Sequence, residues 1–185
     1  DDGTIYEWDL TTATATAVSN APTGCQATFV TEERFLVALG GSNSRLVSWS
    51  DQEDNTTWTA AATNQAGNLE LQTNGTPLAG VRTRGQSLIL TDQDAHTMTY
   101  QGPPFVYGFE RVGTACGMIS AGAYASVDVG VVWMGRRSFF IYSGGQVREI
   151  PCEVADYVFS NLNYDQASKV QAMVNSQWNE IWWVY

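Results

Sequence analysis

A hairpin pattern that recurs four times constrains the fold of this chain more than any other feature. In its first occurrence, the apolar residues 27–30 and 35–39 flank a polar turn at 32–34. The same order recurs around turns at 84–86, 128–130 and 177–179. Short apolar runs separated by tight polar turns are typical of β-hairpins. The sequence therefore predicts an all-β fold.

Each hairpin belongs to a longer repeat. A third apolar strand follows three of the hairpins and ends on Trp49, Tyr100 or Tyr142, and residues 5–8 end in the same way on Trp8. We expect a fourth strand after each of these aromatic residues, at 13–18, 68–71, 105–111 and 146–150. Four-stranded repeats of about 40–50 residues are typical of propeller blades. The prediction is a β-propeller with about four blades' worth of four-stranded antiparallel repeats.

The register of the repeat sets the expected domain organisation. Residues 1–185 form a single propeller domain or part of one, with blades at 1–20, 27–73, 78–112 and 120–153 and the inner strands of a further blade at 169–185. Either the two ends share one blade and close a four-bladed ring, or the chain is a fragment of a larger propeller. The start at Asp1 and the apolar run ending at Tyr185 favour the fragment.

A segment near 152–170 has helical spacing instead. Apolar residues at Val154, Val158 and Leu162 recur at nearly helical intervals, and Asn163 with Asp165 is a candidate cap for a second short helix. We expect a short helical connection between blades here.

Charge limits the classes of partner. The chain has 9 Lys and Arg against 19 Asp and Glu, a net charge of −10, and the acidic residues are scattered. Tight binding of nucleic-acid phosphates needs a clustered basic patch, so such a face is not expected, whereas an acidic wall that repels DNA fits the composition. No apolar run reaches the roughly 18 residues of a membrane span.

The three cysteines, Cys25, Cys116 and Cys152, lack CxxC or Cys/His spacing. We interpret them as buried free thiols of a chain that folds in a reducing cytosol, and we predict no metal or cofactor site.

The most distinctive segment is 48–58, where Trp49 and Trp58 bracket Asp51 and Asp54. One interpretation is a long blade turn in which the two carboxylates accept backbone N–H groups. The other is a saccharide site built from stacking indoles and acidic side chains. The turn interpretation is preferred, and the spacing does not match the Asp-box of sialidases.

Catalytic groups are not evident. A glycosidase needs two paired carboxylates, and the candidates are Asp92, Asp94, Glu110, Asp128, Glu149 and Glu153. Most of them fall at hairpin tips or on alternating strand positions, where solvated charges are expected. His96, the single histidine, has no partner at ligand or triad spacing and is interpreted as a polar strand-edge residue. We predict that the chain is not an enzyme.

Two prolines interrupt the second repeat. Gly102-Pro103-Pro104-Phe105 cannot form a regular central strand, so we expect a rigid turn that leads into the outer strand.

Several of these segments together resemble one protein family. The stretches are 34–40, 46–51 with Trp58, 67–71, 101–109, 113–117, 132–135, 139–142 and 178–183. Over most of residues 27–185 the chain resembles the tail nozzle proteins of short-tailed bacteriophages, also described as tail tubular protein B-like or packaged-DNA stabilisation proteins. Proteins of this family are much longer than this chain. The structural signature residues are Trp49, Ser50, Asp51, Asp54, Trp58, Gly102, Pro103, Pro104 and Phe105.

The resemblance implies a virion structural protein that folds in the host cytoplasm before assembly. Its expected form is a homo-oligomeric ring, often sixfold, that lies below the portal and adaptor and contacts these and other tail proteins in the head-tail connector complex. That ring retains packaged DNA and forms the channel for its ejection without binding it specifically. The alternatives left open are a carbohydrate-binding or glycoside-hydrolysing propeller, and a cellular propeller scaffold for proteins.

Overall fold

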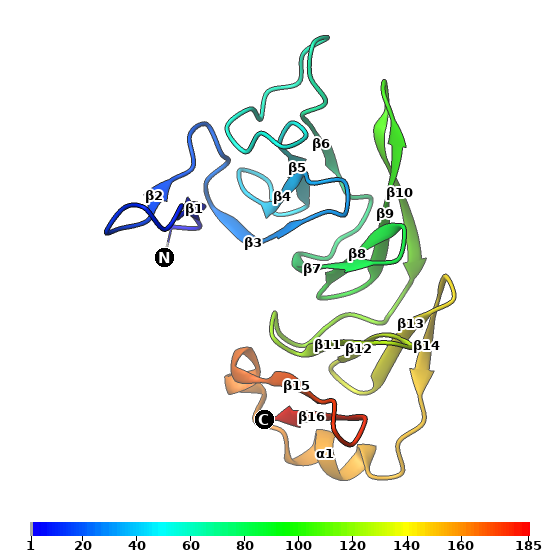
Figure 1. Cartoon of the computed structure of the whole chain (residues 1–185). Helices are drawn as coiled ribbons and strands as arrows, with labels where there is room; N and C mark the ends of the chain where they lie inside the picture. The colour runs from blue at the N-terminus through cyan, green and yellow to red at the C-terminus, as the bar shows by residue number, and fades with distance from the viewer. Residues whose placement is uncertain (1) are drawn as a thin grey trace.

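The computed structural model describes residues 2–185 and has an all-β fold in which antiparallel sheets follow one another along an open arc (Figure 1). The first four-stranded sheet consists of β3 (Cys25–Val30), β4 (Leu36–Gly40), β5 (Leu46–Trp49) and β6 (Gly67–Glu70). The second consists of β7 (Pro77–Thr83), β8 (Gln86–Thr91), β9 (Ala95–Gly102) and β10 (Val106–Gly113). The third consists of β11 (Tyr124–Val127), β12 (Gly130–Met134), β13 (Phe139–Ser143) and β14 (Gln146–Ile150).

A two-stranded sheet lies at each end of the arc. These sheets are β1 (Tyr6–Glu7) with β2 (Thr16–Ala17), and β15 (Gln171–Asn175) with β16 (Glu180–Val184). They do not pair with each other among the described residues. The alternative in which the two ends share one blade and close a four-bladed ring, which the sequence favoured less, therefore does not fit the structure.

Strand order within each sheet follows the chain, because every hydrogen-bonded neighbour is the next strand in sequence. This order places β3, β7, β11 and β15 on the concave side of the arc and β6, β10 and β14 on its outer side (Figure 1). β3 packs beside β7, and β11 packs beside β15.

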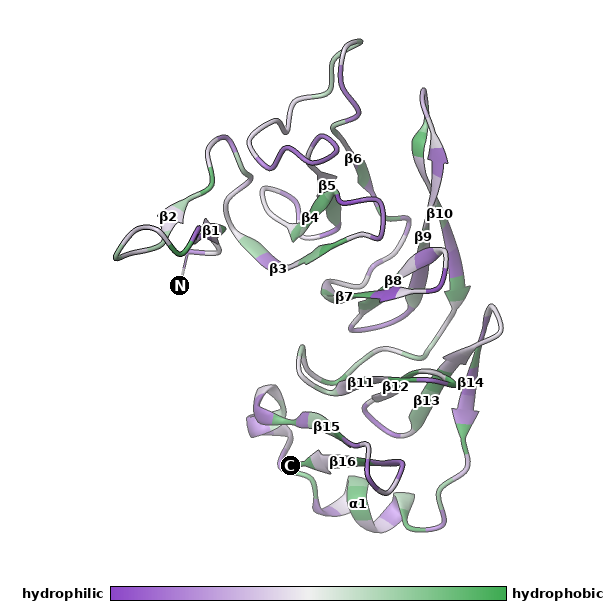
Figure 2. Ribbon diagram, viewed as in Figure 1, coloured by the Kyte–Doolittle hydropathy of each residue, from purple (hydrophilic) through white to green (hydrophobic). Residues whose placement is uncertain are grey.

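The core lies between neighbouring sheets. Between the first two sheets, Phe35, Trp49 and Tyr107 pack edge to face, with ring centroids 5.3 Å apart for Phe35–Tyr107 and 5.4 Å for Trp49–Tyr107. Leu88 and Trp133 are fully buried in the cluster that joins the second and third sheets. Figure 2 shows the matching pattern, with hydrophobic colour in β4 and β5 and hydrophilic colour in the loop between β5 and β6.

The first two sheets also meet through a close approach of β3 to β7. The Phe29 ring lies over Gly80, and a Cβ at Gly80 would overlap this ring. Burying an aromatic side chain here requires a residue without a side chain, so Gly80 sets the distance between the two sheets.

The helical connection is confirmed. An α-helix, α1 (Ala155–Asn161), is followed by the 3₁₀ helix Tyr164–Lys169, and the Asn163 side chain accepts the Asp165 N–H at 3.1 Å. No helix within residues 2–185 has the length and apolar character needed to cross a membrane.

All three cysteines are free thiols. Cys116 is buried as expected, whereas Cys25 and Cys152 are only partly buried, which corrects the expectation for those two.

Candidate functional site

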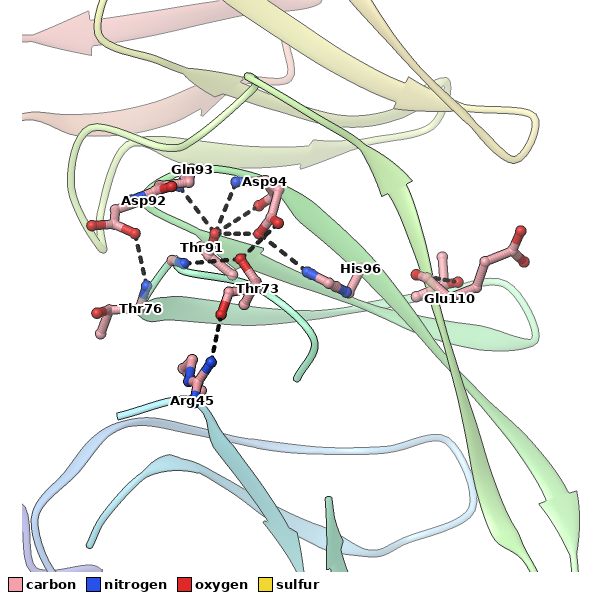
Figure 3. Close-up of polar contacts among 11 residues, drawn as sticks. Arg45, Thr73, Thr76, Thr91, Asp92, Gln93, Asp94, His96 and Glu110 are labelled. Carbon is pink, nitrogen blue, oxygen red and sulfur yellow. Dashed lines mark hydrogen bonds and ion pairs between the residues drawn. The ribbon is translucent and has the colours of Figure 1, made fainter. Parts of the chain in front are cut away.

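A densely hydrogen-bonded polar site lies at the turn between β8 and β9, where Thr91, Asp92, Gln93 and Asp94 meet the segment from β6 to β7 (Figure 3). Thr91 N–H donates to the Asp94 carbonyl at 2.9 Å, and the Thr91 hydroxyl accepts the N–H groups of Gln93 and Asp94 at 3.0 and 2.8 Å. Threonine and aspartate close this turn because their short side chains reach nearby backbone groups.

Asp94 is the centre of the site, with 6% of its surface exposed. Its Oδ2 accepts the Thr73 hydroxyl at 2.7 Å and its Oδ1 accepts the Thr91 hydroxyl at 2.7 Å. His96 Nε2 lies 3.1 Å from the same Oδ1, and against a carboxylate oxygen the ring nitrogen acts as donor. The interpretation of Asp94 as a solvated hairpin-tip charge is therefore wrong.

His96 is 3% exposed in β9 and has Asp94 as its partner, which corrects its interpretation as a strand-edge residue. The order of hydrogen bonds does not fit a nucleophilic triad, in which the hydroxyl would contact the imidazole. Here both hydroxyls donate to the carboxylate instead. Thr73 Oγ1 also accepts the Gly75 N–H at 2.9 Å. This chemistry is suited to holding backbone segments together.

The turn joins all three large sheets. On one side, Arg45 Nη1 donates to the Thr73 carbonyl at 3.0 Å, and Arg45 Nη2 forms an ion pair with Glu70. The first sheet therefore contacts the linker between β6 and β7, which also binds Asp94 through Thr73. Asp92 Oδ1 accepts the Thr76 N–H of the same linker at 2.7 Å.

On the other side, the linker to the third sheet binds the turn through its backbone. The N–H of Cys116 donates to the Gln93 carbonyl at 3.1 Å, and that of Met118 to the Thr91 carbonyl at 2.9 Å. Trp133 Nε1 of β12 donates to the Cys116 carbonyl at 2.6 Å. Burial, with a smaller effect from the nearby Asp94 charge, raises the pKa of the Cys116 thiol to about 11. This thiol is therefore a packing group.

The acidic segment after β5 forms a turn held by its own carboxylates. Asp54 Oδ1 accepts the Thr56 N–H at 2.8 Å and the Thr56 hydroxyl, and its Oδ2 accepts the Thr57 hydroxyl at 2.7 Å. These hydrogen bonds, the Thr56 hydroxyl first, lower the pKa of Asp54 to about 2. Asp51 Oδ1 accepts the N–H groups of Gln52 and Gln65, both at 2.9 Å.

Both indoles of this segment point into the protein. Trp49 is 5% exposed and donates Nε1–H to the Gln65 carbonyl at 2.8 Å, and Trp58 is 8% exposed and donates to the Asn55 carbonyl at 2.6 Å. Ser50 is buried, and its hydroxyl accepts the Leu36 N–H at 3.1 Å. Neither indole offers a free face to a sugar ring.

Gly102, Pro103, Pro104 and Phe105 lie at the tip of the β9–β10 hairpin, where Gly102 pairs with Val106. Phe105 is 76% exposed and touches neither the β8–β9 turn nor the acidic segment through any hydrogen bond. The structure therefore does not bring the two halves of the signature set into one site.

The remaining candidate carboxylates are dispersed. Glu110 is exposed on β10 away from the Asp94 cluster (Figure 3), Asp128 lies in the β11–β12 turn, Glu149 on β14 accepts the Ser138 hydroxyl, and Glu153 precedes α1. Within residues 2–185, no three His, Cys, Asp or Glu side chains are grouped to hold a metal ion.

The concave side of the arc differs from the acidic wall considered above. Its strands β3, β7, β11 and β15 contain no Asp or Glu, and Arg82 is their single charged residue. Carboxylates lie instead on turns, as at Glu32, Glu33 and Asp128.

Comparison with protein-family models and with curated proteins finds no match to this chain.

Proposed function

We propose that the three large sheets are blades of a β-propeller and that the protein is a structural component of a short-tailed phage tail nozzle. In this role it works by assembly into a ring, often sixfold, which retains packaged DNA and conducts it during ejection. The supporting features are the open arc of sheets, the densely tied linkers and the resemblance of residues 27–185 to nozzle proteins.

The observation that carries the proposal is that the two end sheets have open edges and exposed apolar side chains. Each has only two strands, and large apolar side chains lie exposed on or beside them: Tyr6, Trp8 and Leu10 at one end, and Trp178, Trp182, Val184 and Tyr185 at the other. Natural proteins cover open sheet edges, and contiguous exposed apolar groups mark contact surfaces. Both features fit a component of a larger assembly, in which further strands of the propeller or other subunits cover these edges.

Electrostatics supports passage of DNA without specific binding. The net charge of −10 disfavours contact with phosphates. The concave strands add no cluster of cations, because Arg82 is their single charged side chain. The carbohydrate alternative loses its original support, since Trp49 and Trp58 are buried.

Two measurements test the proposal. Phage particles lacking the protein should lose their DNA after packaging, and electron cryo-microscopy of intact particles should place the chain in a ring around the tail axis. Particles that keep their genome and infect normally without it would overturn the assignment.

The assembly step can be tested on the purified protein by light scattering coupled to size-exclusion chromatography. A Trp182→Asp/Tyr185→Asp variant should lower the average mass of the assemblies, because it places charge in the exposed apolar end. Phe105→Asp is the control, since Phe105 is even more exposed than Trp182 and Tyr185 but lies on a hairpin tip away from both end sheets. Equal masses for all three proteins would contradict the role of the end sheets.

A further inference from the structure

A groove of about 730 Å³ lies between the second and third sheets, outside the site described above. Its walls are the turns β7–β8, β11–β12 and β13–β14. Gly144 and Gly145 form one wall with positive φ angles and with open space where a side chain would be. The volume is within the range of about 300–1,000 Å³ that is typical of small-ligand sites.

The floor of the groove is a fixed polar contact between the two sheets. Tyr142 is buried, and its hydroxyl accepts a hydrogen bond from Gln86 Nε2, while Gln86 Oε1 accepts the Thr99 hydroxyl at 3.3 Å. The Tyr142 hydroxyl proton has no acceptor among residues 2–185, so the floor presents a free donor. Burial raises the pKa of Tyr142, which keeps this proton in place at neutral pH.

Charged groups of both signs surround this floor. Arg82 and Arg84 project from the β7–β8 hairpin, are exposed, and form no ion pair within the described part of the chain, whereas Arg34 and Arg45 each pair with a glutamate. Glu32 and Asp128 line the same groove, and Glu32 accepts the Gly85 N–H at 3.4 Å.

This combination selects one class of ligand. Guanidinium groups bind a carboxylate through paired hydrogen bonds, and carboxylates accept hydrogen bonds from hydroxyl groups. A polyphosphate or a DNA strand would place like charges against Glu32 and Asp128 and is disfavoured. A neutral sugar would offer no carboxylate for the guanidinium groups of Arg82 and Arg84 to bind.

We propose that the groove between the second and third sheets binds an acidic saccharide, with its carboxylate at Arg82 and Arg84 and its hydroxyls at Tyr142, Glu32 and Asp128. This inference is independent of the nozzle assignment, since it depends only on the groove. It places the saccharide away from Trp49 and Trp58.

The test is calorimetric titration of the purified protein with tri-galacturonate. The expected result is saturable binding that weakens at least about tenfold in Arg82→Gln/Arg84→Gln, as loss of hydrogen bonds to a charged ligand implies. Tyr142→Phe should weaken it less. Arg136→Gln/Arg137→Gln is the matched control, because it removes the same charge from the β12–β13 turn, which does not line the groove.

Three ligand arms complete the experiment. Fully methyl-esterified tri-galacturonate, which lacks the charge, and inorganic phosphate, which lacks the hydroxyl pattern, should both bind at least about tenfold more weakly. A short DNA duplex should not compete. The proposal is overturned by absence of tri-galacturonate binding, by equal losses in the two arginine double variants, or by equal affinity for the ester.

Discussion

The Asp94 carboxylate accepts the hydroxyl of Thr73 at 2.7 Å across 21 residues of sequence, and this contact fixes the linker between the first two sheets to the β8–β9 turn. The main-chain carbonyls of the same turn accept the N–H groups of Cys116 and Met118 from the next linker, so this one turn contacts both connections between the large sheets.

Replacing Asp94 should therefore destabilise the whole arc. Asp94→Ala leaves the Thr73 hydroxyl and the His96 ring without their acceptor and removes one of the two acceptors of the Thr91 hydroxyl. We expect a loss of about 2–4 kcal/mol in the free energy of unfolding. Urea unfolding followed by tryptophan fluorescence measures it. Asp128→Ala, in an exposed turn, should change stability by less than about 0.5 kcal/mol. Similar effects of the two substitutions would show that the network is not stabilising.

The Asp54 turn should make the free energy of unfolding depend on pH in the acid range. Hydrogen bonds lower its folded-state pKa from 3.8 to about 2, so between these values the unfolded state binds more protons and stability rises with pH. The contribution is fully present above about pH 4 and is lost as pH falls toward 2. Asp54→Asn should flatten this part of the stability profile, measured as the urea midpoint from pH 2 to 5.

Thr57→Val offers an intermediate case for the same turn. It removes one hydroxyl donor and leaves the Thr56 contacts, so the acid transition should move toward higher pH without disappearing. An unchanged profile in both variants would contradict the assigned role of the Asp54 carboxylate.

Gly80 should not tolerate a side chain. Gly80→Ala places a methyl group into the Phe29 ring, and overpacking of this kind costs about 1–3 kcal/mol. A Phe29→Leu change in the same protein should recover part of the loss, because the smaller side chain makes room. Gly108→Ala is the control, since a Cβ there meets only the flexible Gln101 side chain. Thermal unfolding compares the wild type, Gly80→Ala, Gly80→Ala/Phe29→Leu and Gly108→Ala. If Phe29→Leu restores none of the lost stability, the close contact between Gly80 and the Phe29 ring is contradicted.

Thiol reactivity should separate the cysteines. Cys116 is buried and its pKa is raised to about 11, so it should resist maleimide at pH 7.5 until the protein unfolds. Cys25 and Cys152 are partly exposed and should react in the native state. Mass spectrometry of labelled peptides, with and without urea, identifies each site. If Cys116 in the folded protein reacts with maleimide as fast as Cys152 does, the burial of Cys116 is contradicted.

Local chemistry explains which features could be predicted from the sequence. The hairpin turn at 32–34 could be predicted because polar residues separate two apolar runs. In the structure, Arg34 adopts the positive φ that this turn requires. The helical connection was readable from apolar spacing and from Asn163 as a cap.

The Asp94 cluster was missed because Thr73 and the linkers that surround it are distant in sequence. The spacing of Thr91, Asp94 and His96 was a local signal for a turn closed by side chains. The sequence left a shared end blade open as an alternative because strand register within a repeat does not specify which edges meet in space.

Strand order that follows the chain also has a mechanical consequence. A pull on the two ends would act first on β1–β2 and β15–β16 and would then open each hairpin from its last strand, breaking hydrogen bonds a few at a time instead of shearing many together. Such contacts form between near neighbours along the chain, which also favours rapid refolding once the load is removed. The resistance of this protein to force should therefore come from hydrogen bonds between sheets, such as Thr73–Asp94 and Gln86–Tyr142, because these join separate hairpins.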